Sequence, residues 1–320
     1  ASDVYKRQKP VILSVVGESG CGKSTLCKMV LRLHNPDMGD IVLDGQSYRD
    51  KKSYNAKQFK LEVQPIFQNP YESFSARKPV DSYLFNTALR LGIAKNKAEA
   101  TNLVDDALKS VGLSLAVVKG KYPTQFSGGE LQRVSIARAL ITRPKLIIAD
   151  EPVAAIDASM KMNIVNLFKE LKDKYKVSFI YITHDLGVVA NVADRVAVMY
   201  AGQIVEYGTV EEIFYDAWHP YTWALLQALP QLGTKGEALP SVDGTPPNLF
   251  NEIKGDAFAP RNKHALAIDF VQEPPFFQVS ETHAAKTWYL DPRAPKIERP
   301  HSIQNLREKM GKMGGSNLNG

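Results

Sequence analysis

A glycine-rich segment near the start of the chain has the residue types and spacing of a phosphate-binding loop. The segment GESGCGKST follows the apolar run 11–16 and precedes a helix-like stretch. Glycines let backbone N–H groups turn inward around a phosphate chain, and a helix start adds unpaired donors and a positive dipole. The candidate nucleotide-binding residues are Gly17, Glu18, Ser19, Gly20, Cys21, Gly22, Lys23, Ser24 and Thr25. We expect Lys23 to reach the β- and γ-phosphates and the Ser24 hydroxyl to ligate Mg²⁺.

Two adjacent acids could carry the chemistry of phosphoryl transfer to water, which needs a metal clamp and an oriented water. The continuous apolar run 146–150 predicts a buried parallel strand that ends in Asp150 and is followed by Glu151. Carboxylates there lie beside the glycine-rich loop at the carboxyl edge of the sheet. We expect Asp150 to hold Mg²⁺, directly or through water, and Glu151 to polarise the attacking water. The alternative is a solvated loop that happens to hold two acids.

A second helix start is predicted in the segment FSGGELQR, residues 126–133. Ser127 can cap this helix, and Gly128 and Gly129 expose backbone N–H groups at its start, as an anion site requires. An ordinary capped helix is the alternative. Gln68 follows the strand candidate 61–67, and His184 follows the strand candidate 177–183. Taken alone, each of these two residues is uninformative.

The elements that must position these residues alternate between strand and helix. Further strands are predicted at 40–45, which ends in an Asp-Gly turn, and at 195–200. Residues 80–120 are helical in pattern, with Asn96 as a cap and Gly112 as a stop. Thr209 and Glu212 have the spacing of a capping box. The alternation favours a mostly parallel sheet and an α/β fold.

Composition places the chain among globular proteins. It has 320 residues, 44% hydrophobic and 23% charged, and its apolar runs are too short to span a membrane. The net charge of +6 is spread without a block of like charges, so a solvated surface is the simpler interpretation than an anionic partner. The 2 cysteines, both near the glycine-rich loop, give no disulfide framework and agree with a reducing compartment.

Taken in order, these motifs resemble the nucleotide-binding subunits of ABC transporters, over about residues 11–215. The glycine-rich loop is the Walker A motif, and residues 126–130 are the signature, FSGGE where the family favours LSGGQ. Residues 146–150 are the Walker B motif, with the catalytic Glu151 after it. The remaining motif residues are Gln68 in the Q-loop, Asp157 in the D-loop and the switch residue His184.

The resemblance implies a head-to-tail dimer of ATPase cassettes, homo- or heteromeric, that binds ATP with Mg²⁺. Glu151, His184 and Gln68 would then be catalytic, and Ser24, Gln68 and Asp150 would hold Mg²⁺. The signature residues Ser127, Gly128, Gly129 and Glu130 would serve the partner's ATP. An aromatic residue upstream of the P-loop stacks on adenine in such cassettes, and Tyr5 is too close to Gly17 to match it. Only 16 residues precede Gly17, so we expect a truncated N-terminus.

The C-terminal part resembles the extension of oligopeptide and dipeptide importers. Its matching strings are His219 to Leu226, Ala228 to Pro230, Gly244 to Pro247 and Phe258 to Arg261. Many relatives hold an iron–sulfur cluster here through four cysteines. The matching positions in this chain are Asp256, Asn262, Asp269 and Thr287. Since no thiolate remains, no cluster is expected. We expect hydrogen bonds, together with Phe258, Phe270, Phe276, Phe277 and Trp288, to replace it.

The sequence therefore predicts an α/β P-loop NTPase core with a helical subdomain and a small Pro-rich C-terminal extension. The expected domains are an ABC ATPase domain at 1–215 with a helical subdomain at about 75–140, an oligopeptide-transporter C-terminal domain at 216–298, and a disordered tail at 299–320. The expected function is to energise peptide import from the cytoplasmic face of the cell membrane. The partners would be a second cassette, two permease subunits and, indirectly, an extracytoplasmic binding protein, with no nucleic acid.

Two other functions stay open. The first is the same role in an importer of nickel or another small solute, since this chain need not touch the cargo. The second is an ABC ATPase of DNA repair or translation. Repair ATPases carry a long coiled coil between P-loop and signature, and translation ATPases carry two cassettes in one chain; neither feature is present here.

Overall fold

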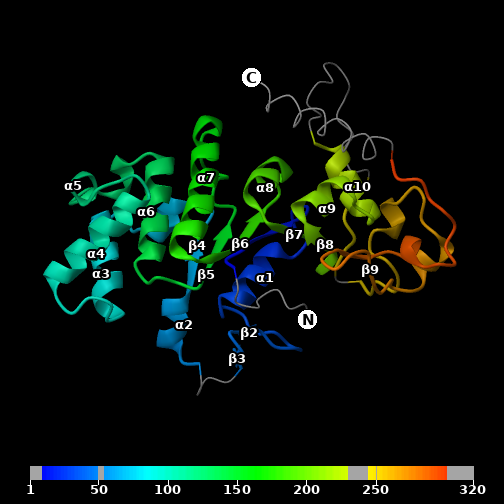
Figure 1. Ribbon diagram of the computed structural model, residues 1–320, viewed down its shortest axis with the longest axis horizontal. Helices are drawn as coiled ribbons and strands as arrows, with labels where there is room; N and C mark the ends of the chain where they lie inside the picture. The colour runs from blue at the N-terminus through cyan, green and yellow to red at the C-terminus, as the bar shows by residue number, and fades with distance from the viewer. Residues whose placement is uncertain (1–8, 50–53, 230–243, 250, 301–320) are drawn as a thin grey trace. The chain divides into compact units, whose positions relative to one another are not determined.

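The computed structural model describes residues 9–49, 54–229, 244–249 and 251–300 (Figure 1). These residues form two compact units. The first unit comprises Ala1–Leu13 and Ser24–Ile182, and the second comprises Ser14–Lys23 and Thr183–Gly320. Tyr5 and the tail beyond residue 300 lie outside the described residues. Among the described residues, no helix combines the length and the apolar character that crossing a membrane requires.

Parallel strands form the centre of the first unit. Their order is β4 (Val63–Ile66), β5 (Leu146–Asp150) and β6 (Ser178–Thr183). Strand β5 is buried along its first four residues, as its continuous apolar run predicts. The start of β1 (Ile12–Val16) lies beside β6, where the Phe179 N–H donates to the Val11 carbonyl over 2.9 Å.

Helices surround these strands in the first unit. They are α1 (Lys23–Val30), α2 (Ala56–Glu62), α3 (Val80–Arg90), α4 (Lys97–Ser110), α5 (Leu115–Val118), α6 (Gly128–Leu140) and α7 (Ala158–Tyr175). Helices α3 to α6 lie together in Figure 1, within the range of about 75–140 expected for a helical subdomain. The predicted caps of α4 are confirmed: the Asn96 side chain accepts from the Glu99 N–H over 2.9 Å, and Gly112 has a φ of 77°.

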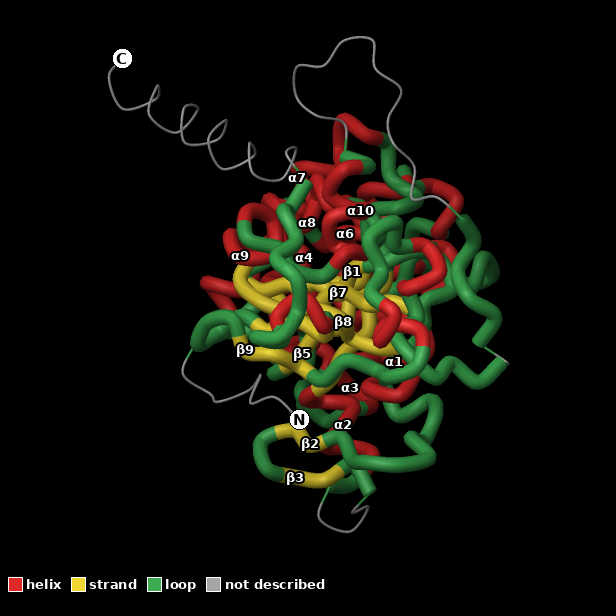
Figure 2. Tube along the Cα trace, turned by 90° about the vertical axis from the view of Figure 1, so that its right-hand side faces the viewer, coloured by secondary structure: helices red, strands yellow, loops and turns green. Residues whose placement is uncertain are grey.

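Two of the predicted strands are shorter than the sequence pattern indicated. The strand expected at 61–67 begins at Val63, because Asn55 caps α2 and that helix continues to Glu62. The strand expected at 40–45 is reduced to β2 (Val42–Leu43), which pairs with β3 (Gln46–Ser47) in the hairpin seen in Figure 2. Asp44 and Gly45, at φ of 51° and 76°, make the predicted turn between them.

Antiparallel strands form the sheet of the second unit. Their order is β7 (Arg195–Tyr200), β8 (Gln203–Thr209), β10 (Ala284–Lys286) and β9 (Phe276–Gln278). The α-helices are α8 (Leu186–Val192), α9 (Val210–Tyr215) and α10 (Pro220–Gln227). The capping box predicted for α9 is confirmed, since Thr209 and Glu212 each accept the other's backbone N–H. Short 3₁₀ turns complete the unit: Ala259–Arg261, Ala267–Phe270 and Trp288–Leu290.

One apolar core in the second unit joins the end of β1 to the C-terminal segment. Its buried members are Val16, Leu186, Val189, Val196, Val198, Tyr200, Val205, Ile213, Phe214, Ala217, Tyr221, Trp223, Leu226 and Phe258. Phe258 and Trp288 are buried as expected, at 3% and 7% exposure. The expectation that Phe270 and Phe276 are packed inside was wrong, because 54% and 47% of these side chains are exposed.

Candidate functional site

The P-loop has the backbone conformation that its glycines permit. A Cβ atom on Gly17 would lie 2.1 Å from the Met199 carbonyl oxygen of β7, so a side chain cannot fit there. Gly20 and Gly22 have φ of 82° and 104°, which favour glycine. The loop then enters α1 at Lys23 and leaves residues 19 and 20 exposed.

Lys23 closes this loop from within. Its side chain is buried, and Nζ donates to the carbonyl oxygens of Gly17 at 2.8 Å and Glu18 at 2.9 Å. The ammonium therefore lies inside the turn of the loop, where the phosphates of a bound nucleotide would lie. Ser24 and Thr25 follow in the first turn of α1 with exposed hydroxyl side chains. Together these groups form a cradle with one cation, backbone donors and hydroxyls, which suits a triphosphate.

Glu18 is held by residues that the sequence analysis did not connect with the P-loop. Its carboxylate pairs with Arg261, with 2.7 Å from Nη1 to Oε2 and 3.0 Å from Nη2 to Oε1. Its backbone N–H donates to the Tyr221 hydroxyl over 2.7 Å. Both partners lie in the strings that resemble the importer extension, but nothing in those strings indicates a contact with the loop.

The parallel register brings the Q-loop glutamine to the acid after Walker B. Ile66 of β4 is opposite Ala149 of β5, so Gln68 and Glu151 each lie two residues beyond paired positions. The Gln68 amide donates to the Glu151 carboxylate, with 3.2 Å between Nε2 and Oε2. Glu151 has a φ of 44°, and its N–H donates to the Ile182 carbonyl of β6 over 2.9 Å. This bond fixes a backbone conformation that a residue with a side chain rarely adopts.

Asp150 lies at the end of β5, and its negative charge affects the pKa of Cys27 in α1. Burial and then the Asp150 carboxylate raise the pKa of the Cys27 thiol to about 12. This residue of α1 therefore lies in the negative field of Asp150.

The signature segment forms the predicted helix start, with Ser127 as the cap of α6. Ser127 Oγ accepts from the Glu130 N–H over 3.2 Å, and Glu130 Oε2 accepts from the Ser127 N–H over 2.9 Å. The carboxylate thus completes a capping box that a glutamine amide could also complete. The backbone N–H of Ser127 is the first cause of the lowered Glu130 pKa.

The Q-loop is also bonded to the signature helix, which the sequence analysis missed. Gln132 Nε2 donates to the Phe67 carbonyl over 3.3 Å, and the Tyr71 hydroxyl donates to the Phe126 carbonyl over 3.1 Å. These contacts join the segment around Gln68 to the first residue of the signature and to α6 just after the signature. No sequence pattern marks residues 65 and 55 positions apart as partners.

The last two motif residues lie at element ends. Asp157 immediately precedes α7, without a side-chain capping bond. His184 is exposed between β6 and α8, next to Asp185, which caps α8 by accepting from the Val188 N–H. An exposed imidazole at a strand end is accessible to a ligand.

The four positions that match the cluster ligands of relatives hold turns instead. Asp256, Asn262, Asp269 and Thr287 accept from the N–H groups of residues 258, 264, 266 and 289 respectively. This confirms the expectation that polar side chains tie these turns to the backbone. Gly255 packs so closely that a Cβ on it would lie 2.0 Å from the Asp269 carbonyl oxygen. Within the described ranges, no three His, Cys, Asp or Glu side chains are arranged to hold a metal ion.

A buried polar cluster is centred on Glu206 of β8, and the sequence did not predict it. Glu206 accepts from the backbone N–H groups of Trp218 and His219, at 2.7 and 3.1 Å, and contacts His283 Nε2 at 2.8 Å. His219 Nδ1 accepts from the Tyr221 N–H over 3.1 Å. Among the described residues, His219 Nε2 has no hydrogen-bond partner and lies 3.9 Å from an Asp256 oxygen. Burial lowers the His219 pKa to about 4 and raises the Asp256 pKa to about 6.

Comparison with protein families matches two segments of the chain. The family described as "ABC transporter" matches residues 6–154. The family described as "Oligopeptide/dipeptide transporter, C-terminal region" matches residues 205–268.

Characterised proteins align along nearly the whole chain. The dipeptide transport ATP-binding protein DppD of Lactococcus lactis is 45% identical over 93% of this chain and 87% of its own length. The oligopeptide transport ATP-binding protein AmiE of Streptococcus pneumoniae is 46% identical, over 94% and 87%. The OppD protein of Bacillus subtilis is 44% identical, over 96% and 87%.

Solved structures share the fold. The structure of cbiO1 from Clostridium perfringens, part of the ABC transporter complex cbiONQ, matches with a TM-score of 0.58 and 27% identity, over 65% of this chain and 80% of that one. The ATP-binding cassette MJ0796, in a dimeric post-hydrolysis state bound to ADP and Pi, matches with a TM-score of 0.55 and 26% identity, over 63% and 87%.

Proposed function

Because the chain belongs to the ABC transporter family, among its oligopeptide and dipeptide transport ATP-binding proteins, we propose that it hydrolyses ATP to energise peptide import. The observation that carries this function is the hydrogen bond between Gln68 and Glu151. It joins a Q-loop to a carboxylate at the end of a Walker B strand, in a chain that also holds a P-loop with a buried lysine.

The P-loop residues 17–25 would hold the nucleotide. Lys23 offsets the charge of the β- and γ-phosphates, and the backbone donors of the loop bind their oxygens. Ser24, Gln68 and Asp150 would hold Mg²⁺, since hydroxyl, amide and carboxylate oxygens are the hard ligands this ion prefers. When bound, the ion neutralises negative charge on the phosphate oxygens. Oxygen donors on neighbouring elements of one unit fit that role.

Three side chains would serve the hydrolysis itself. Glu151 accepts a proton from the attacking water and so raises its nucleophilicity. Gln68, bonded to the same carboxylate, would help to orient that water and would be a ligand of Mg²⁺. His184, exposed after β6, donates to the γ-phosphate. Each role is assigned by matching the motifs of the family to these positions.

The proposed assembly is a pair of cassettes on two permease subunits at the cytoplasmic face of the membrane, where an external binding protein delivers the peptide. Signature residues 127–130 would complete the ATP site of the partner cassette, and Asp157 would lie at the dimer contact. The proposed domains are an ATPase domain at 1–215, with its helical subdomain at about 75–140, and a C-terminal domain at 216–298.

The test is nucleotide binding and turnover by the full chain, with and without its permease subunits. Lys23→Ala should weaken MgATP binding, because it removes the cation inside the loop. Lys97→Ala, at the exposed start of α4, is the matched control and should bind normally. Unchanged MgATP affinity in Lys23→Ala contradicts the P-loop assignment. In the assembled transporter, stimulation of the ATPase by binding protein loaded with nickel but not with peptide would exclude the peptide cargo.

A further inference from the structure

The P-loop is anchored from behind by two residues that lie more than 200 positions later in the chain. Arg261 binds both carboxylate oxygens of Glu18, and Tyr221 accepts the Glu18 N–H. We propose that Arg261 and Tyr221 are positioning residues, which set the affinity of the P-loop for nucleotide without touching it. This inference rests on the proposed function, because it concerns how the ATP site is held.

Contacts other than the ion pair with Glu18 also hold the Arg261 side chain in place. Only 5% of its side chain is exposed, and its guanidinium lies over the rings of Tyr200 and Phe258, 5.8 and 5.7 Å from their centroids. Nη1 also donates to the Tyr200 hydroxyl over 3.1 Å. The 3₁₀ turn Ala259–Arg261 that carries it is held by Asp256, which accepts from the Phe258 N–H. A guanidinium that these contacts already hold loses little conformational freedom when it forms two parallel hydrogen bonds to a carboxylate.

Tyr221 is fixed as firmly. It lies in the first turn of α10, where its own N–H donates to the His219 side chain. Its ring is fully buried, and its centroid is 4.4 Å from that of Tyr200. The hydroxyl is therefore held in one position, where it accepts the Glu18 N–H.

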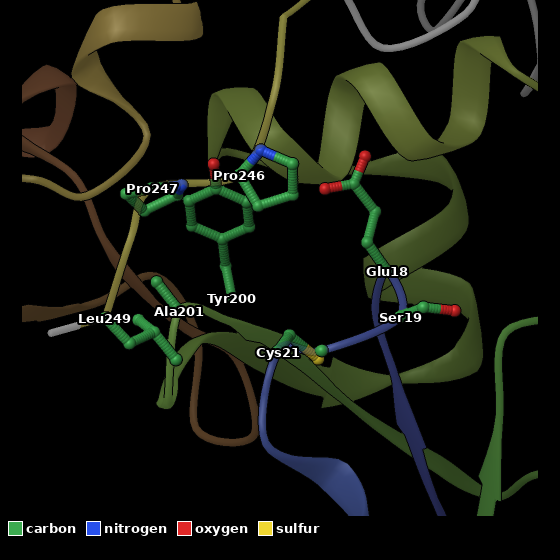
Figure 3. A pocket seen from close by; sticks show the side chains of 9 residues that line it. Glu18, Ser19, Cys21, Tyr200, Ala201, Pro246, Pro247 and Leu249 are labelled. Carbon is green, nitrogen blue, oxygen red and sulfur yellow. The ribbon is translucent and has the colours of Figure 1, made fainter.

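The remaining space behind the loop is small. Figure 3 shows Pro246, Pro247 and Leu249 near Tyr200, facing the P-loop residues Glu18 and Cys21. The cavity among them is about 20 Å³, room for a single water and not for a ligand. This face of the loop thus serves as a support.

The anchor has an electrostatic as well as a geometric consequence. Lys23 donates to the carbonyl oxygens of Gly17 and Glu18, so the residue that Arg261 grips also helps to place the lysine. Without the guanidinium, the carboxylate of Glu18 would add an unpaired negative charge next to a site for a polyphosphate. Loss of Arg261 would therefore weaken nucleotide binding in two ways, through the placement of Lys23 and through the unpaired Glu18 charge. It would leave the groups proposed to act on the attacking water unchanged.

The experiment compares MgATP affinity and turnover in variants of the full chain with substitutions at Arg261 and Tyr221. Arg261→Met and Tyr221→Phe should each raise the MgATP Kd and KM, about tenfold for Arg261→Met, with kcat at saturation within about twofold. Arg261→Lys, which keeps the charge and loses one of the two bonds, should lie between wild type and Arg261→Met. Adding Glu18→Gln to Arg261→Met should recover part of the affinity, because it removes the unpaired charge.

Arg293→Met is the matched control. Arg293 also pairs with a carboxylate through two bonds, to Asp291, but 84% of its side chain is exposed and it does not contact the P-loop. The Arg293→Met variant should bind MgATP with the affinity of the wild type. Thermal unfolding of each variant shows whether it is folded; if Arg261→Met is not, Tyr221→Phe and Arg261→Lys decide.

The outcomes separate this inference from the proposed function. If wild type does not bind MgATP, the proposed function fails. If wild type binds, Lys23→Ala does not, and the folded anchor variants match Arg293→Met in Kd and KM, then the proposed function stands and the anchor is wrong. A fall in kcat at unchanged KM also overturns it, since that result assigns Arg261 to the reacting state instead of to nucleotide binding.

Discussion

The amide of Gln68 and the carboxylate of Glu151 are in direct contact, with 3.2 Å between Nε2 and Oε2, at the carboxyl ends of two neighbouring parallel strands. The segment around Gln68 is also bonded to the signature, because Tyr71 donates to the Phe126 carbonyl and Gln132 of α6 donates to the Phe67 carbonyl. A displacement of this segment therefore moves a ligand of the proposed catalytic acid. The contact gives a physical route from α6 to the proposed site of hydrolysis.

We expect Glu151→Gln to bind ATP with near wild-type affinity and to lose turnover by about 10²- to 10⁴-fold. The amide cannot accept a proton from water, whereas Lys23, Ser24 and Asp150 still hold the nucleotide. The measurement is ATPase activity in the assembled transporter beside a direct binding titration. Glu170→Gln, on the exposed face of α7, is the control. A Glu151→Gln variant with most of the wild-type rate would remove Glu151 from the mechanism.

Ser127→Arg should leave this chain's own P-loop able to bind ATP and block the site on the partner cassette. The long cation would occupy the helix start where the partner's phosphates are proposed to lie. Photolabelling of each cassette in the assembled pair measures the two sites separately.

A control is needed because Ser127 also caps α6. Loss of the cap costs about 1 kcal/mol of stability, which Ser127→Ala reproduces without the bulk. Loss of labelling on the P-loop of the Ser127→Arg chain itself, with the partner's site intact, would refute the trans arrangement.

Asp256→Asn should make the stability of the folded chain fall more steeply as pH decreases from 6 to 4. Burial lowers the His219 pKa from 6.5 to about 4, so the unfolded chain binds more protons in that window and stability falls with falling pH. Burial raises the Asp256 pKa from 3.8 to about 6, so the folded chain binds more protons there and stability rises with falling pH. In wild type the two effects oppose each other, and the substitution removes the second.

Urea unfolding at several pH values between 4 and 7 measures the slope. Adding His219→Asn to Asp256→Asn removes both titrations and should flatten the difference from wild type. Parallel profiles for wild type and Asp256→Asn would show that Asp256 titrates as it does in the unfolded chain.

Anaerobic purification followed by iron analysis and visible absorption should find no stoichiometric iron. The side chains at the four matching positions supply oxygen acceptors that already bind backbone N–H groups, and iron–sulfur clusters are held by thiolates. Stoichiometric iron with cluster absorbance would mean that other residues hold it.

Local patterns predicted the local parts of the structure. The P-loop, β5, the caps of α4, the Ser127 cap of α6 and the capping box of α9 depend on residues within a few positions of one another, and each is found where expected. The strand expected at 61–67 was too long, because a capped helix competes with it for residues 61 and 62. There the helix cap at Asn55, six residues earlier, outweighs the strand pattern.

Contacts between distant segments could not be predicted. Glu18 and Arg261 are separated by 243 positions, and no periodicity or composition links them. The buried cluster of Glu206, His219 and His283 is likewise assembled from three separate segments of the chain. Phe270 and Phe276 show the converse error, since their apolar character suggested burial that the chain path does not provide.

The apolar core that includes Val16, Tyr221 and Phe258 has a consequence for how the chain can be divided. Motifs suggest a boundary after residue 215, as if a cassette and an appendage had been joined end to end. The core instead takes the end of β1 from one side of that boundary and most of its aromatic rings from the other. A chain cut at 215 would expose this core and so fold poorly or aggregate. The C-terminal segment is therefore part of the fold of the second unit and not a detachable module.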